Sequence, residues 1–106
     1  MVLKLIEEAL KEFEEKKEMF LKGIKKVSEE YGVRCYLFGS RVKGTELRSS
    51  DLDVLVVIPS DKWNKKWEIY EKMKKACNDN PFVEIHIISE DAFEELRKLY
   101  EPLVPL

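Results

Sequence analysis

The sequence predicts a small α/β (α+β) domain in which a mixed β-sheet of three or more strands carries helices. Three observations indicate this fold: a long amphipathic pattern at the N-terminus, three short apolar runs typical of strands, and helical patterns beside the later runs. A chain of 106 residues suits one compact domain, so we expect residues 1–106 to form a single unit. Within it, residues 1–31 comprise an N-terminal helix and residues 33–90 the core.

The N-terminal pattern predicts one long helix over residues 2–31. Gly32 follows it, at the position where a left-handed residue ends many helices. At 1.5 Å per residue the helix is roughly 45 Å long, whereas a domain of this size is roughly 26 Å across. We therefore expect part of its apolar stripe to pack on something outside the domain. The stripe recurs at steps of three and four and comprises Leu3, Ile6, Leu10, Phe13, Phe20, Ile24, Val27 and Tyr31.

Three runs are typical of strands because β-branched and aromatic residues dominate them. They are residues 33–38 (VRCYLF), 51–58 (DLDVLVVI) and 82–88 (FVEIHII). The second run is almost continuously apolar, which indicates burial on both faces. The connection between the first two runs is short for a parallel crossover, so we expect that pair to be antiparallel. A helix separates the second run from the third, which suits a right-handed parallel crossover.

Turn residues separate three further helical segments. Pro59-Ser60-Asp61 ends the second strand, Ser89 can cap the last helix, and Ser40 can cap a short helical turn. The tail after residue 100 contains two prolines, so it cannot be the interior of a regular helix. The predicted segments are residues 41–47, 62–78 and 90–100.

Charge and apolar patterning exclude several classes of protein. The chain carries 19 basic and 21 acidic residues, with a formal net charge of −2, so no basic field would attract nucleic acid. No signal-peptide pattern is present, and no apolar run approaches the ~18 residues of a membrane span. We therefore expect a cytoplasmic protein without membrane contact. Cys35 and Cys77 lack metal-ligand spacing, and we expect reduced, packed thiols, with a disulfide as the alternative.

The second predicted strand begins with two carboxylates. Asp51 and Asp53 are two residues apart, so on a strand they point to the same side, about 6–7 Å apart along the chain. Two such carboxylates repel each other unless a cation lies between them, and hard oxygen ligands suit Mg²⁺. The alternative is that Asp51 caps a turn and Asp53 is a surface residue.

Alternation along the third predicted strand adds another acid. Glu84 and His86 fall on one face, opposite Val83, Ile85 and Ile87, and the second strand divides in the same way. We therefore expect an acid face and an apolar face to run through both strands. Glu84 is the expected third acid, as metal ligand or general base, with a solvated carboxylate as the alternative. His86 is the only histidine, and a structural role is the simpler interpretation.

A Gly-Ser pair closes the first predicted strand. Gly39 has no Cβ, so the backbone there can approach a ligand closely. Ser40 presents its hydroxyl and the amides of a helix N-terminus to an anion. Arg41 and Lys43 add positive charge beside that position. An ordinary strand–helix junction is the alternative.

The string FGSRVKGTELRSSDLDVLVV, residues 38–57, resembles the signature of the DNA polymerase β-like nucleotidyltransferase superfamily, in its minimal nucleotidyltransferase subgroup. The resemblance extends from residue 33 to about residue 90. It implies the nucleotidyltransferase fold, ATP as substrate and two Mg²⁺ ions. The site residues implied are Gly39, Ser40, Arg41 and Lys43 for the nucleotide phosphates, and Asp51, Asp53 and Glu84 for metal binding and catalysis. Many members carry Asp where this chain has Glu84. The glutamate side chain is longer, so its carboxylate extends further from the strand than that of an aspartate.

The resemblance also implies a partner. Minimal nucleotidyltransferases commonly act as antitoxins beside a HEPN-type ribonuclease toxin, and some transfer AMP from ATP to a tyrosine of that toxin. Larger members carry an extra domain for the acceptor, and these 106 residues leave no room for one, so we expect a second polypeptide to supply it. A homodimer through the N-terminal helix would use the same stripe. The remaining alternatives are an antitoxin that acts by complex formation alone, and a stand-alone transferase acting on a small molecule or an RNA end.

Overall fold

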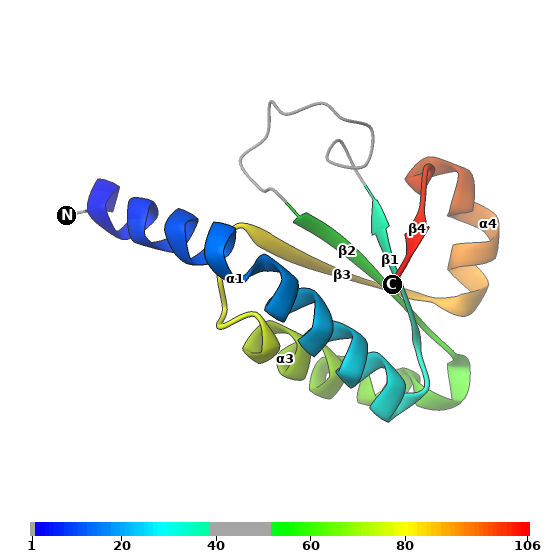
Figure 1. The fold of residues 1–106 in the computed structure, drawn as a ribbon. Helices are drawn as coiled ribbons and strands as arrows, with labels where there is room; N and C mark the ends of the chain where they lie inside the picture. Colours follow the sequence, from blue (N-terminus) through cyan, green and yellow to red (C-terminus); the bar gives the residue numbers. More distant parts are fainter. Residues whose placement is uncertain (1, 39–51) are drawn as a thin grey trace.

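The computed structural model describes residues 2–38 and 52–106 (Figure 1). The described chain forms four strands and four helical segments, which confirms the predicted α+β fold class. The predicted turn over residues 41–47 lies outside the described residues. The elements are α1 (Val2–Tyr31), β1 (Arg34–Phe38), β2 (Leu52–Ile58), the 3-10 helix η1 (Ser60–Lys65), α3 (Lys66–Ala76), β3 (Val83–Ser89), α4 (Glu90–Tyr100) and β4 (Val104–Pro105).

The strands form one mixed sheet in the order β3-β2-β1-β4. β1 pairs with β2 in antiparallel orientation and β2 with β3 in parallel orientation, which confirms both predicted pairings. The tail adds a fourth strand that the sequence did not predict: Val104 pairs with Leu37 and Pro105 with Tyr36. β4 is an edge strand of two residues, where a proline without an N–H group is tolerated.

Helices cover both faces of the sheet (Figure 1). α1 and α3 cover one face, where Val54 and Val56 pack among Phe20, Ile24 and Met73. α4 covers the other face, with Phe93 against Leu55 and Val57. Every residue of β2 is buried, as the continuous apolar run predicts.

The prediction that an acid face runs through β2 and β3 is wrong beyond their first residues. Leu55 and Val57 share the face of Asp53, and Ile88 shares that of Glu84, yet all three are buried in the cluster around Phe93. α4 returns along this face of the sheet and requires apolar side chains beneath it. The polar part of the face is therefore confined to the end of the sheet where β2 and β3 begin.

The long N-terminal helix is confirmed, and it extends beyond the sheet. The longest dimension of the molecule is 43 Å, and the N-terminal part of α1 projects past the strands (Figure 1). Phe13, Phe20 and Ile24 are buried, whereas Leu5 is 66% exposed and Ile6 is 47% exposed. Gly32 ends the helix with φ +67°, as predicted. The described domain thus covers only part of the apolar stripe.

The predicted helix over residues 62–78 is shorter than expected. A 3-10 turn, η1, precedes it, and regular α-helix runs only from Lys66 to Ala76. Ser60, Asp61 and Asn64 are weak helix formers that compete for backbone hydrogen bonds, and 3-10 turns are frequent at helix N-termini. Ser89 caps α4 as predicted, because its hydroxyl accepts a hydrogen bond from the Ala92 amide at 3.1 Å.

Cys35 and Cys77 are free and buried, as predicted for packed thiols. Burial raises the pKa of Cys35 to about 12 and that of Cys77 to about 11, so both are protonated at neutral pH. The protonated thiol is a poor nucleophile. Among the described residues, no helix is both long and apolar enough to cross a lipid bilayer.

Asn80 fixes the start of β3 against α1. It is 1% exposed, and its amide nitrogen donates to the Ala9 carbonyl at 2.9 Å and to Glu12 Oε1 at 3.1 Å. Its amide oxygen accepts from the Phe82 backbone N–H at 2.9 Å. This side chain therefore joins the helix to the turn that leads into Glu84.

We predict that Asn80→Ala lowers the free energy of unfolding by about 1–3 kcal/mol, because it leaves buried polar groups without partners. Asn64→Ala, at an exposed position of η1, is the matched control and should change it by less than about 0.5 kcal/mol. Urea unfolding followed by circular dichroism measures both. Equal losses in the two variants would contradict a joining role for Asn80.

Candidate functional site

Two carboxylates lie side by side where β2 and β3 begin. The parallel register pairs Asp53 with Glu84, so their side chains leave the same face of the sheet. Asp53 is 3% exposed, whereas more than half of the Glu84 side chain is exposed. One acid is thus held inside the protein and the other can be reached from solvent.

His86 completes a group of three polar side chains. It lies two residues beyond Glu84 on β3 and so points to the same face. Its Nε2 atom is 3.1 Å from Glu84 Oε1 and 3.7 Å from Asp53 Oδ1. One ligand atom from each of the three residues lies within 4.8 Å of the others. The three side chains can therefore approach a single ion.

The aromatic ring of Phe38 borders this group. Phe38 is paired with Asp53 across β1 and β2, and its ring meets His86 edge-on, with centroids 5.1 Å apart. Tyr100, from the C-terminal end of α4, also meets the Phe38 ring edge-on, with centroids 5.1 Å apart. The imidazole therefore lies in contact with an aromatic ring as well as close to the two carboxylates.

The donor set fits a divalent cation. His86 Nε2 has almost no solvent-accessible surface and makes no hydrogen bond of acceptable geometry within the described part of the chain. A buried polar atom without a hydrogen bond calls for an explanation, and an ion is a common one. Carboxylate oxygens are the ligands of Mg²⁺ and Mn²⁺, and imidazole is a ligand of transition ions.

The predicted site residues divide into two groups. The structure brings Asp53 and Glu84 together, as the alternation of the strands indicated. Their roles as metal ligands and catalytic groups stay predictions. His86 was left outside the predicted site, although its two-residue spacing from Glu84 was a signal that it shares the face. The predictions for Gly39, Ser40, Arg41, Lys43 and Asp51 concern residues outside those that the structure describes.

Fold and site together define a class: a small α+β protein with a candidate acidic metal site at the end of a mixed sheet. The chain belongs to the nucleotidyltransferase domain family, whose model, described as "Nucleotidyltransferase domain", matches residues 20–102. That match covers β1, β2, β3, α3 and α4, together with residues 20–31 of α1. The predicted superfamily is therefore confirmed, and the fold is that of a nucleotidyltransferase.

Two solved structures are similar to this chain, each described as a crystal structure of a "putative nucleotidyltransferase". The first is 28% identical with a TM-score of 0.65, and the match covers 81% of this chain and 96% of the other. The second, from Sulfolobus solfataricus, is 19% identical with a TM-score of 0.56 and covers 92% and 84%; it supports the fold alone. No curated protein matches the sequence.

We predict that a divalent cation stabilises the protein through Asp53 and Glu84. A ligand that binds only the folded state adds about 2.7 kcal/mol at one hundred times its dissociation constant. Thermal unfolding with and without Mg²⁺ or Mn²⁺ should therefore show a rise in Tm for the wild type, and little or none for Asp53→Asn or Glu84→Gln.

Glu71→Gln is the control for that experiment, because it removes an exposed carboxylate from α3, on the opposite side of the sheet. It should keep the full increase in Tm. An undiminished increase in the Asp53→Asn protein would show that the cation binds elsewhere.

Proposed function

We propose that this protein is a metal-dependent nucleotidyltransferase that transfers AMP from ATP to a hydroxyl group, the acceptor being a tyrosine of a HEPN-type toxin. The observation that carries the proposal is the convergence of Asp53, Glu84 and His86 at one end of the sheet in a chain of this family. The identity of the acceptor rests on the resemblance of residues 38–57 to the minimal subgroup.

The acids differ in what they can contribute. Asp53 is buried and fixed by its position in the fully buried strand β2, so it can hold a cation in a constant position. Glu84 is exposed, so it can also meet an incoming hydroxyl group and accept its proton. A divalent cation bound here would neutralise charge on the triphosphate and lower the pKa of the attacking hydroxyl.

The remaining roles rest on the sequence pattern. Asp51 would add a further carboxylate for two Mg²⁺ ions. Gly39 and Ser40 would position the β- and γ-phosphates, with Arg41 and Lys43 supplying positive charge. Correct positioning and electrostatic stabilisation are the main contributions that a protein makes to this kind of transfer.

The exposed end of α1 supports a partner protein. The N-terminal part of α1 projects past the sheet (Figure 1), and Leu5 and Ile6, near the start of this helix, are exposed within the described residues. Exposed apolar side chains on a helix are a frequent means of binding another helix. A helical toxin is the partner we propose, and a second copy of this chain is the alternative.

Transfer is tested by incubating the protein with α-labelled ATP, Mg²⁺ and a candidate HEPN-type partner. We predict that label appears on the partner, and that Asp53→Asn reduces the rate by at least about a hundredfold, because a charge-stabilising group in the active site is lost. Glu71→Gln should label the partner at the wild-type rate. Label lost after Tyr→Phe substitution in the partner would identify the acceptor.

Other outcomes separate the alternatives. A tight complex that carries no label would support an antitoxin that acts by binding alone. Label on RNA or a small molecule in the absence of any partner would support a stand-alone transferase. Labelling of a partner at equal rates by the wild type and Asp53→Asn would contradict the proposed active site.

We predict that Leu5→Glu combined with Ile6→Glu abolishes complex formation by α1. Both side chains are exposed, so the free energy of unfolding of the isolated chain should change by less than about 0.5 kcal/mol. Size-exclusion chromatography with light scattering measures the complex or dimer. Lys11→Glu, at an exposed position of the same helix, is the control for charge. A complex that survives the double substitution would place the partner elsewhere.

A further inference from the structure

We propose that His86 binds the divalent cation directly through Nε2, together with Asp53 and Glu84, and that this nitrogen ligand makes the site prefer a first-row transition ion to Mg²⁺. This inference is about which ion the site binds. It rests on the proposed function only because both assign Asp53 and Glu84 as metal ligands. It assigns a role to the one residue of the group that the sequence left outside the predicted site.

The position of Nε2 supports direct binding. It is 3.1 Å from Glu84 Oε1 and 3.7 Å from Asp53 Oδ1. Neighbouring ligand atoms of an octahedral ion with bonds of 2.1 Å are about 3 Å apart, so both separations are close to those of ligands that share one ion. A small movement of the Asp53, Glu84 and His86 side chains toward one another would bring all three ligand atoms within bonding distance of one ion.

His86 Nε2 is a buried polar atom that makes no hydrogen bond within the described residues. The atom is shielded from solvent and, within the described residues, lacks a hydrogen bond of acceptable geometry despite its nearness to Glu84. A buried polar nitrogen that makes no hydrogen bond costs free energy. A cation between the imidazole and the carboxylates would give Nε2 the partner that it lacks.

Packing keeps the imidazole in this orientation. The Phe38 ring meets it at 72°, and Tyr100 meets the Phe38 ring at 84°, so an aromatic side chain of β1, itself in contact with α4, packs against the histidine. The His86 side chain as a whole is 41% exposed, which leaves a route for an ion to reach the site. A ligand held in place before the ion arrives binds it more tightly than a mobile one.

The ligand types then determine which ion is preferred. Mg²⁺ prefers oxygen ligands and gives up its water reluctantly. Imidazole is a ligand of transition ions such as Mn²⁺, Co²⁺ and Zn²⁺. The affinity of a given site rises from Mn²⁺ through Co²⁺ to Cu²⁺, so Mn²⁺ is the most weakly bound of the three. Two carboxylates and one imidazole therefore favour a transition ion over Mg²⁺, whereas carboxylates alone would not.

The chain offers a direct spectroscopic test, because His86 is its only histidine. In tag-free protein loaded with Mn²⁺, pulsed electron paramagnetic resonance should detect coupling to a directly bound imidazole nitrogen, and the coupling should change on ¹⁵N-histidine labelling. Neither nucleotide nor acceptor is present, so this result and the proposed transferase activity can fail independently. Bound Mn²⁺ without nitrogen coupling would overturn the proposal.

Affinities give the second measurement. Calorimetric titration with Co²⁺ and Mg²⁺ should show that His86→Ala weakens Co²⁺ binding by on the order of tenfold or more and Mg²⁺ binding by less than about threefold. Equal losses for the two ions would show that His86 only orients Glu84, which also overturns direct binding. The spectrum of the wild type keeps the proposal testable if the variant fails to fold.

Discussion

The parallel register between β2 and β3 is the constraint on which the rest of this structure depends. It pairs Asp53 with Glu84 and places His86 one step further along the same face. A shift by one residue would turn every side chain of a strand to the opposite face. Such a shift would bury the acids under α1 and α3 and turn Val54 and Val56 away from that core, so the same hydrophobic burial that stabilises the core also fixes the site.

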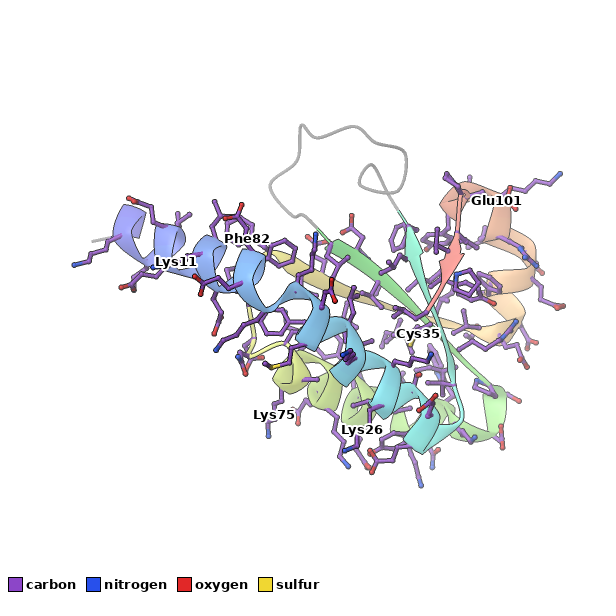
Figure 2. The ribbon with its side chains drawn as sticks, in the orientation of Figure 1. Lys11, Lys26, Cys35, Lys75, Phe82 and Glu101 are labelled. Carbon is purple, nitrogen blue, oxygen red and sulfur yellow. The ribbon has the colours of Figure 1, made fainter. Side chains whose placement is uncertain are left out.

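The fold protects this register from both sides. β2 is buried along its whole length, between α1 and α3 on one face and α4 on the other (Figure 1). Cys35 belongs to the apolar cluster between the sheet and α1, and Phe82 packs against the same cluster (Figure 2). The polar end of the sheet is therefore presented by a rigid support, which a metal site needs.

The sequence predicted the fold class and the pairing of three strands because each depends on local patterns and on connection lengths. Two errors have physical causes: β4 is too short to show alternation, and α4 makes the face beyond Asp53 apolar, which the pattern of β2 alone cannot reveal. Alternation predicted the shared face of Asp53, Glu84 and His86. The distances between these side chains could not be predicted, because they depend on the register of β2 and β3.

The most direct test of this account is the position of a bound cation. Crystals grown with Mn²⁺ and measured at the manganese absorption edge should give an anomalous peak that marks the ion. The distances from this ion to carboxylate oxygens of Asp53 and Glu84 and to His86 Nε2 should be about 2.0–2.2 Å. A peak at another place, or full loading that leaves Asp53 and Glu84 unbound, would contradict the claim that the register of β2 and β3 builds a metal site.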